Sequence, residues 1–555
     1  IIVRGVNYYC YEIEEAVSSV PGVEPTFVAV CVVQRGDEEQ LALFFVPRKP
    51  GLDPALLRAV RDRVSGDFGL APSIVIPLSR DEFPKTTSGK IQRDKLRRGL
   101  WSGRFDKPRR EVDLALANER TVPRWAFQRR WVGRDLEQGP VPGATVMGDG
   151  ATAHALRQGL APGEAVIWAG ETAAADILDL LKEISPKGGR LLVLASGADD
   201  NVALAPARAL LLGAAQEWPG LDARLVELDT SDEASVLARV QGELRSRTRE
   251  PEVRWVDGQR RVPRLEEAPL IRGDEWLHPG ATVLITGGLG GIGTLLAREL
   301  LTRLEARVLL VGRRDLETDG EQDGDQLGRV AGAAERRYAL SQLEALPGEV
   351  LYRAADVTDT ARMEEVIAEA ASRWGALDGA VHLAGTFPSR LLAEEDENSM
   401  AAVMAPKVQG ARVLHELLPL DAFLLGFGSV YGVFGGYAGG AYAAACASLE
   451  AFMAWRRDNG RARSASLSWS NWDEVGLSRD FAFREQSVER GFRMITPRRG
   501  LASLFAAMCG PGRDLVLGLD PTRAHVRRFL DGKPEVLERL VAYHTASSAP
   551  RGAAL

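Results

Sequence analysis

The sequence predicts an α/β protein in which a small α+β unit precedes two halves, each built on a parallel β-sheet. From about residue 119 to residue 535, apolar strand-like runs alternate with helical segments, an order typical of parallel sheets. A glycine-rich turn lies between strand and helix in ATVLITGGLGGIGTLLARELL. The first hundred residues differ, because two apolar strands, 27–33 and 41–46, precede one amphipathic helix, DPALLRAVRDRV.

Bulk composition limits the class of protein. The chain has 555 residues, enough for three or four units at about 150 residues per domain. Hydrophobic residues make up 45% and charged residues 26%, as in ordinary water-soluble domains. The net charge of −7 argues against nucleic-acid and membrane-surface partners. No apolar run approaches the roughly 20 residues of a membrane span. We therefore expect a cytoplasmic protein with no nucleic-acid or membrane partner.

The four cysteines are scattered along the chain without a CxxC pair. Zinc sites and disulfide frameworks both need closely grouped or regularly spaced cysteines. The sequence therefore predicts no metal site, and it fits a reducing compartment.

Shifts in composition divide the chain into five segments. Residues 1–105 form the α+β unit, which closes on SRDEFPKTTSGKIQRDKLRRGL. Residues 106–118 are charged and contain proline, so we expect a linker. The first half covers 119–272, and its opening turn, GDGATAH, lacks a full glycine pattern, so we expect no nucleotide there. The second half covers 273–535. The tail 536–555 has the small, Pro/Gly-bearing composition of a linker to a following domain.

The second half opens with the glycine-rich turn TGGLGGIG, and a further strand, RVLLVGRR, follows about 20 residues later. Glycines here let the backbone turn tightly and approach a pyrophosphate, which the positive end of the following helix attracts. An isolated glycine pattern also occurs in ordinary turns, but here strand, turn and helix follow in the required order. We therefore expect a Rossmann-like dinucleotide site at Thr286, Gly287, Leu289, Gly291, Ile292 and Gly293.

The end of the next strand bears on which nicotinamide cofactor binds. NAD sites usually carry an acidic residue there, whereas this sequence has Arg313 and Arg314. Guanidinium groups suit a 2′-phosphate, which favours NADPH, although Asp315 keeps NADH open and a solvated basic turn is the alternative. Two later strands also end at this edge of the predicted sheet. We expect them to line the same crevice through Asp356, Val357, Ala384 and Gly385.

A tyrosine lies within a run of small residues, AYAAACASLEAF, in the second half. A carbonyl that accepts hydride needs a proton donor, and the phenol of Tyr442 holds its proton too tightly unless a cation lowers its pKa. Lys407, on the predicted helix MAAVMAPKVQGARVLHELL, supplies such a cation. Ser429, at the end of the strand in DAFLLGFGSVYG, supplies a hydroxyl that can orient the carbonyl. Each residue alone has an ordinary structural explanation, and only their joint occurrence favours chemistry.

Residues 119–535, about three quarters of the chain, resemble the ketoreductase unit of modular polyketide synthases, in the short-chain dehydrogenase/reductase superfamily. The resemblance rests on TGGLGGIG, LLVGRR, AADVTD, HLAG, PKVQGA, GSVYG, GGAYAAA and LSWSNW. It implies a degenerate first half that braces an NADPH-binding catalytic half. It also implies that Ser429 orients the carbonyl, Tyr442 donates the proton and Lys407 lowers the Tyr442 pKa.

The resemblance fails at one position, where Cys446 replaces the usual Asn four residues after the tyrosine. Asn donates and accepts hydrogen bonds, whereas a thiol does both weakly. A working but retuned site and a weakened site both remain open, and Cys446 could simply pack. The usual stereochemical markers are missing as well, because AGTFPSRLL replaces an Asp-bearing motif and Phe434 replaces a Trp. The product configuration therefore stays unassigned.

The first hundred residues resemble the C-terminal subdomain of adenylate-forming ligases. RGVNYYCYEIEEAV is similar to the fatty acyl-AMP ligase version, and FPKTTSGKIQR is similar to the motif that carries an essential lysine. The resemblance implies that Lys90 would stabilise charge during adenylation, with a basic surface loop as the alternative. The large ligase core would precede residue 1, so we expect no adenylation from this chain alone.

The sequence thus predicts an NADPH-dependent ketoreductase within a multidomain polyketide or polyketide/nonribosomal peptide synthase. Its substrate would be an oxoacyl thioester on the phosphopantetheine arm of an acyl carrier protein, and its other partner the missing ligase core. A 3-oxoacyl chain is the family default. The direct succession of ligase piece and reductase resembles depsipeptide synthetases, which reduce 2-oxoacyl groups. An inactive reductase serving as a structural module, and a free-standing dehydrogenase of soluble alcohols, are the rival interpretations.

Overall fold

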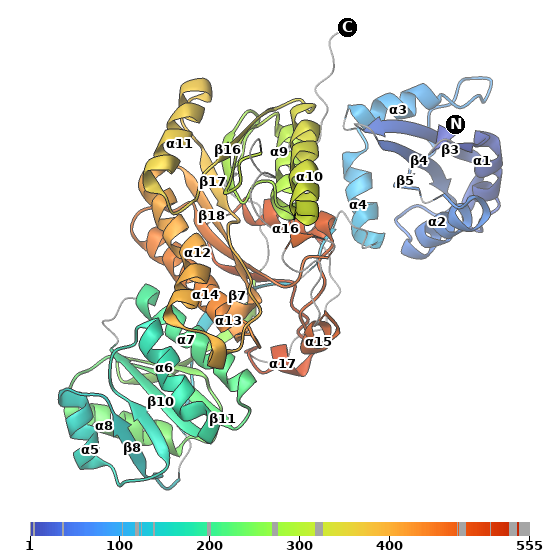
Figure 1. Ribbon diagram of the computed structural model, residues 1–555. Helices are drawn as coiled ribbons and strands as arrows, with labels where there is room; N and C mark the ends of the chain where they lie inside the picture. Colours follow the sequence, from blue (N-terminus) through green and yellow to red (C-terminus); the bar gives the residue numbers. More distant parts are fainter. Residues whose placement is uncertain are drawn as a thin grey trace. The chain divides into compact units, whose positions relative to one another are not determined.

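The computed structural model describes most of the chain, and it divides into two compact units, Ile1–Arg124 with Leu537–Leu555, and Trp125–Val536 (Figure 1). The described residues are 2–3, 6–35, 38–70, 72–102, 104–116, 121–123, 125–136, 139–196, 201–268, 276–316, 326–473, 475–476, 484–510, 512–531 and 541–542.

The first unit is built on a three-stranded sheet in the order β3-β4-β5. Strands β3 and β4 pair antiparallel, with Cys31 opposite Ala42, whereas β4 and β5 pair parallel. Alternate residues of β3 face opposite ways: Val30 packs in the cluster that contains α1 and α2, and Ala29 packs in the cluster that contains α3. The bounds are β1 (Ile2–Val3), β2 (Val6–Asn7), α1 (Cys10–Ser18), β3 (Val23–Arg35), β4 (Glu38–Pro47), α2 (Pro54–Phe68), β5 (Ile74–Pro77) and α3 (Arg93–Trp101).

The segment that we expected to be a linker, 106–118, instead contains helix α4 (Asp106–Leu116). Pro108 lies in its first turn, where backbone N–H groups have no helical partner, so the proline does not interrupt the helix. Val112 is 2% exposed and packs in the core of the first unit. Within the expected tail linker, β21 (Val541–Ala542) pairs antiparallel with β6 (Thr121–Val122), and the remainder of that tail lies outside the described residues.

The second unit contains one sheet of 14 strands in the order β16-β15-β14-β17-β18-β19-β20-β7-β13-β12-β11-β10-β9-β8. Strands β14 to β20 belong to the second half, and their order is the doubly wound one typical of dinucleotide-binding folds. Strand β7 joins the halves, because it pairs antiparallel with both β20 and β13. The α/β class with two Rossmann-like halves is therefore confirmed.

The elements of the first half alternate as the apolar runs predicted. Its strands are β7 (Ala126–Gly133), β8 (Ala144–Met147), β9 (Ala165–Trp168), β10 (Gly189–Ser196), β11 (Leu221–Leu228), β12 (Glu252–Val256) and β13 (Gln259–Glu267). Its helices are α5 (Ala151–Gly159), α6 (Ala174–Ile184), η1 (Ser185–Lys187), α7 (Asn201–Glu217) and α8 (Glu233–Arg245).

The second half has helices on both faces of its parallel strands, with α11, α12 and α14 on one side and α9, α10 and α16 on the other (Figure 1). Its strands are β14 (Thr282–Thr286), β15 (Arg307–Gly312), β16 (Glu349–Ala354), β17 (Gly379–His382), β18 (Phe423–Ser429), β19 (Ser464–Trp469) and β20 (Leu515–Leu517). Its helices are α9 (Gly291–Leu304), α10 (Gln326–Glu344), α11 (Thr360–Trp374), η2 (Leu392–Glu394), α12 (Glu397–Leu417), α13 (Val430–Phe434), α14 (Gly440–Asp458), α15 (Arg484–Arg490), α16 (Pro497–Ala507) and α17 (Ala524–Arg527).

The small residues around Tyr442 are explained by packing between the two halves. Helix α14 packs against α7, and Ala441, Ala444 and Ala447 lie in one buried cluster with Leu210 and Ala214 of α7. Alanine side chains let two helices approach closely. The run of alanines therefore positions α14, and Tyr442 with it, against the first half.

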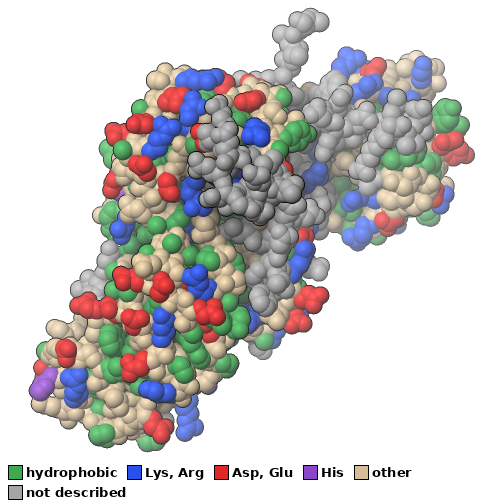
Figure 2. Space-filling model, in the orientation of Figure 1, with side chains coloured by type: hydrophobic (Ala, Val, Ile, Leu, Met, Phe, Trp, Pro, Cys, Tyr) green, Lys and Arg blue, Asp and Glu red, His purple; other side chains and the backbone are tan. Residues whose placement is uncertain are grey.

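The face of the molecule drawn in Figure 2 shows no dominant charge among its described residues. On the face drawn in Figure 2, acidic and basic side chains are interspersed over the described residues. Among those residues, no helix is both long and apolar enough to cross a membrane. No group of three or more His, Cys, Asp or Glu side chains in the described ranges could hold a metal ion.

Candidate active site

The glycine-rich turn joins β14 to α9 and leaves no room for side chains. Gly287 has φ +69°, a left-handed conformation that favours glycine. A Cβ added at Gly293 would lie 2.6 Å from the carbonyl oxygen of Gly288. A Cβ added at Gly291 would lie 3.1 Å from the backbone nitrogen of Gly476, in the loop that follows β19. The turn therefore offers exposed backbone to a ligand at the N-terminus of α9.

A cavity of about 750 Å³ extends from this turn to the end of β18. Of the residues predicted to bind cofactor, those lining it are Gly287, Leu289, Gly291, Ile292, Gly293, Arg313, Arg314, Ala384 and Gly385. A smaller cavity of about 160 Å³ is lined by Thr286 and Val357. Asp356 lines neither cavity, because its carboxylate accepts hydrogen bonds from the backbone N–H and the hydroxyl of Thr358 instead. The structure thus gathers most of the predicted set and leaves Asp356 aside.

Thr286 has an internal role that the sequence did not suggest. Its side chain is fully buried, and its hydroxyl oxygen accepts hydrogen bonds from the backbone N–H groups of Leu383 and Ala384. His382 lies on its other side, with Nδ1 2.8 Å from the Thr286 hydroxyl and Nε2 3.0 Å from the carbonyl oxygen of Lys407. A carbonyl can only accept, so Nε2 donates to Lys407 and Nδ1 accepts from Thr286. This chain of hydrogen bonds ties the glycine-rich turn to helix α12.

Tyr442, Ser429 and Lys407 line the same cavity as the glycine-rich turn. Ser429 ends β18, and its hydroxyl caps α13 by accepting from the N–H of Tyr431 at 3.3 Å. Tyr442 lies in the first turn of α14, where the side chains of Ser429 and Cys446 both influence the pKa of its hydroxyl. Three residues that are distant in the sequence are therefore brought to one wall.

Lys407 is 3% exposed, and its ammonium group donates a hydrogen bond to the carbonyl oxygen of Phe427 at 2.7 Å. The Lys407 nitrogen also lies 5.7 Å from the ring centre of Tyr442. A Cβ added at Gly385 would lie 2.9 Å from Lys407 Cε, so this glycine makes room for the lysine. Burial lowers the pKa of Lys407, because the charged form loses hydration.

The pKa of Tyr442 differs from the expectation. We expected Lys407 to lower it, yet burial raises the pKa of Tyr442 well above its ordinary value, and the neighbouring Cys446 raises it further. The hydrogen bond from Ser429 acts in the opposite direction. The net effect keeps the phenol protonated at neutral pH, which is the form that a proton donor needs.

Cys446 lies one helical turn after Tyr442 and is fully buried. Burial is the largest influence on the pKa of its thiol, and the Lys407 charge and the Tyr442 hydroxyl act against it. Burial raises the pKa of the Cys446 thiol, so the neutral form persists at neutral pH. Cys446 is therefore buried next to Tyr442 and Lys407, two residues of the predicted catalytic group.

Sequence reasoning missed the aromatic wall of this cavity. The ring of Phe387 meets Tyr442 edge-on at 5.0 Å between centroids and meets Tyr431 at 5.6 Å. A Cβ added at Gly439 would lie 2.8 Å from Tyr431 and 3.0 Å from Phe387, so this glycine admits both rings. The signal available in the sequence was Phe387, the aromatic residue of AGTFPSRLL.

Lys90 lies in the first unit, at the end of a turn formed by residues 86–90. The N–H of Lys90 donates to the Thr86 hydroxyl at 3.0 Å, and the Thr86 N–H donates to the Lys90 carbonyl at 2.9 Å. Gly89 completes the turn with φ +83°. The side chain of Lys90 is exposed, so this turn presents the lysine on the surface of its own unit.

Comparison with known proteins identifies the class of the second unit. Residues 281–474 match the family model of the KR domain. The phenolphthiocerol/phthiocerol polyketide synthase of Mycobacterium tuberculosis (strain CDC 1551 / Oshkosh) has a polypeptide that is 32% identical over 387 residues, which are 67% of this chain and 20% of that protein. Polyketide synthase PksL of Bacillus subtilis (strain 168) is 28% identical over 379 residues, 65% of this chain and 8% of that protein.

Two solved structures extend the comparison. The adenylation, ketoreductase and pseudo Asub multidomain structure of a keto acid-selecting NRPS module matches 97% of this chain and 51% of its own, with TM-score 0.78 and 25% identity. The PlmKR1 ketoreductase from the first module of phoslactomycin biosynthesis in Streptomyces sp. HK803 matches 74% of this chain and 97% of its own, with TM-score 0.60 and 26% identity.

The chain therefore contains a KR domain, of the kind found in modular polyketide synthases. The resemblance inferred from the sequence motifs is confirmed, and a neighbour that covers almost the whole chain also contains an adenylation domain. The matched region spans about a fifth or less of the first curated relatives' own length.

Proposed function

We propose that this chain reduces the keto group of an oxoacyl chain, held as a thioester on an acyl carrier protein, with NADPH as the reductant. The observation that carries the proposal is that Tyr442, Ser429 and Lys407 line one cavity with the glycine-rich turn. The relatives supply the context, because the chain resembles parts of modular synthases, whose substrates remain tethered between reactions.

The residues of the turn fit a dinucleotide. The positive φ of Gly287 and the crowding at Gly293 require glycine at both positions, so a pyrophosphate could approach the backbone of the turn closely. Arg313 and Arg314 are exposed on its wall and would pair with a 2′-phosphate, which favours NADPH over NADH. When bound, the nicotinamide would supply hydride to the carbonyl carbon.

The chain's own side chains would donate the proton and stabilise the charge that remains. The protonated phenol of Tyr442 would give its proton to the carbonyl oxygen, so that the ketone gains one hydride and one proton and becomes an alcohol. The Ser429 hydroxyl would hydrogen-bond the same oxygen and fix its position. The Lys407 ammonium, near the Tyr442 ring, would stabilise the phenolate that remains.

Within this function we favour a 2-oxoacyl substrate. The neighbour that matches 97% of this chain is a keto acid-selecting NRPS module, whereas the neighbours that match about three quarters of it are ketoreductases alone. A keto acid activated by a ligase and loaded directly onto a carrier carries its ketone at position 2. The 3-oxoacyl chain of polyketide synthases is the alternative. Lys90 would serve the loading step together with a ligase core.

A second candidate is a ketoreductase fold that binds NADPH without turnover and acts as a structural module. The specific observation behind it is the thiol of Cys446 beside Tyr442, where an amide would make stronger hydrogen bonds. Cofactor binding does not distinguish the two candidates, because the glycine-rich turn serves both. Turnover does.

The test is NADPH consumption by this chain with matched 2-oxoacyl and 3-oxoacyl phosphopantetheine thioesters. We expect turnover with the 2-oxoacyl thioester, and a loss of about 10²–10⁴-fold in Tyr442→Phe, the range for a positioned acid. NADPH binding should be unchanged in that variant. Binding of NADPH without turnover of either thioester would favour the structural module. Faster turnover of the 3-oxoacyl thioester would contradict the proposed 2-oxoacyl substrate.

A further inference from the structure

The end of helix α7, in the first half, reaches two loops of the second half. Glu217 is the last residue of this helix, and its carboxylate accepts backbone hydrogen bonds from Leu392 at 2.8 Å and from Ala438 at 3.1 Å. These partners are 175 and 221 residues away in the sequence. One carboxylate thus bridges the loop that ends at the start of η2 and the loop before α14.

Both loops lead directly to the site. Phe387, whose ring meets Tyr442 at 5.0 Å, lies five residues before Leu392, and Tyr442 lies four residues after Ala438. The loops also bond to each other, because the N–H of Arg390 donates to the Ala438 carbonyl at 2.9 Å. Leu392 is fully buried, and a Cβ added at Gly440 would lie 2.3 Å from its side chain. The start of α14 is therefore defined by these contacts.

The backbone at this point needs external support. Ala438 has φ +49°, a left-handed conformation that is uncommon for a residue other than glycine and persists only where surrounding contacts impose it. Its N–H and its carbonyl are both engaged, by Glu217 and by Arg390. A carboxylate at a helix C-terminus is electrostatically unfavourable. Burial also raises the pKa of Glu217, while its two backbone hydrogen bonds oppose that rise.

We infer that Glu217 is a positioning residue for the reduction, fixing Tyr442 and Phe387 from the half that does not carry the glycine-rich turn. This inference rests on the proposed function and deepens it. The first half then contributes to catalysis as well as to structural support, because one of its carboxylates determines the position of the proton donor Tyr442. A misplacement on the order of 1 Å at a reacting group costs up to about 100-fold in rate.

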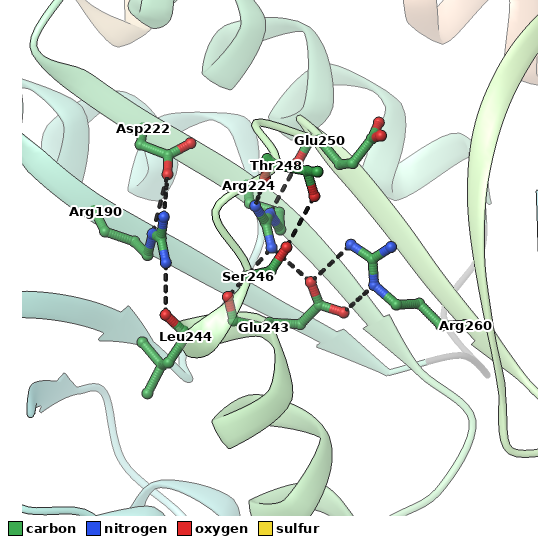
Figure 3. Close-up of polar contacts among 9 residues, drawn as sticks. All are labelled: Arg190, Asp222, Arg224, Glu243, Leu244, Ser246, Thr248, Glu250 and Arg260. Carbon is green, nitrogen blue, oxygen red and sulfur yellow. Dashed lines mark hydrogen bonds and ion pairs between the residues drawn. The ribbon is translucent and has the colours of Figure 1, made fainter. Parts of the chain in front are cut away.

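The test variant is Glu217→Gln, which keeps the side-chain size but replaces one acceptor oxygen with an NH₂ group facing a backbone N–H. The matched control is Glu243→Gln, also in the first half, where a buried carboxylate binds Arg224 and Arg260 instead (Figure 3). We expect Glu217→Gln to lower kcat about 10- to 100-fold with unchanged NADPH Kd and a smaller loss of Tm than the control. The control should lower Tm and keep kcat.

Hydrogen exchange adds a measurement that needs no turnover. Amides in 385–392 and 435–442 should exchange faster in Glu217→Gln than in the parent, with the turn at 286–293 unchanged. Unchanged kcat and exchange, or a loss of Tm and NADPH affinity in parallel with kcat, would overturn the inference. If the parent chain reduces neither thioester, the proposed reduction itself fails, while exchange still reports whether Glu217 holds the two loops.

Discussion

Arg224 and Lys407 are both buried cations, one in each half of the second unit, and their charges are balanced in different ways. The Arg224 side chain is 1% exposed and pairs with Glu243 at 2.6 Å, and Glu243 also binds Arg260 (Figure 3). Its remaining donors reach backbone carbonyls, including that of Thr248. Among the described residues, the ion pairs include none for Lys407, whose ammonium donates to the Phe427 carbonyl.

The difference separates a structural charge from a chemical one. A buried cation with a carboxylate partner is held in one state, and removing the partner is costly. A buried ammonium that meets only dipoles stays responsive to charge that develops nearby, and such groups concentrate at functional sites. Lys407 lies close to the Tyr442 ring, where the proposed reaction would generate a phenolate. Within the described part of the chain, the buried cation of the second half thus lacks the carboxylate partner that the buried cation of the first half has.

The largest expected effect is on turnover in Lys407→Met. Met fills a similar volume without a charge, so the phenolate at Tyr442 would lose its cation and turnover should fall by about 100-fold or more. Stability should be unchanged or higher, because a buried ammonium without a carboxylate partner costs free energy. NADPH consumption and thermal unfolding, measured on the same preparation, check both statements.

The Glu243→Gln control should give the reverse result. Breaking a buried ion pair by removing one partner costs about 3–5 kcal/mol, and here two arginines lose their carboxylate. Turnover per folded molecule should be retained. If Lys407→Met lowers Tm as much as this control, the distinction between a structural and a chemical charge is wrong.

His382 extends the comparison to pH. Burial, and then the charge of Lys407, lower the pKa of His382 from 6.5 to about 3. Because the unfolded chain binds this proton more readily, stability should fall as the pH drops from about 6.5 towards 3, by about 3 kcal/mol at pH 4. In His382→Asn that contribution is removed. Denaturant unfolding at pH 7 and pH 4 should show the parent losing more stability than the variant.

The sharpest contradiction would be an equal loss in both proteins. The variant gives up the hydrogen bond to the Lys407 carbonyl at every pH, so its stability at pH 7 should already be lower. Only the change between the two pH values tests the titration of His382. An equal change would mean that protonation of His382 does not cause the loss of stability at low pH.

Local sequence patterns were enough to predict the fold class and part of the cavity lining. The glycine-rich turn and the strand ends carry their signal within about ten residues, so Gly287, Gly293 and Gly385 could be placed in advance. The run of small residues around Tyr442 was visible in the sequence, but its packing of α14 against α7 is seen only in the folded chain. Charge and proline in 106–118 gave no sign of helix α4 or of the buried position of Val112.

The remaining features depend on contacts between distant segments. Glu217 looks like an ordinary helix-end carboxylate in the sequence, and only the folded chain brings it to Leu392 and Ala438. His382 belongs to the HLAG motif, yet its link to the Lys407 carbonyl requires two strands and a helix to meet. Asp356 shows the converse, since a residue at the correct strand end turned to cap its own loop.

The smallest expected effect comes from Cys446→Asn, which tests whether the thiol weakens the site. An amide would strengthen hydrogen bonding to Tyr442 by about 1 kcal/mol, so turnover should rise by less than about ten-fold. Space is limited, because a Cβ added at Gly432 would lie 3.0 Å from Cys446 Cβ, and overpacking costs about 1–3 kcal/mol. The variant should therefore melt at a lower temperature while turning over slightly faster. A gain of about 100-fold or more would instead show that Cys446 holds the parent in a weakened state. The charge of Lys407 would then contribute little to turnover in the parent.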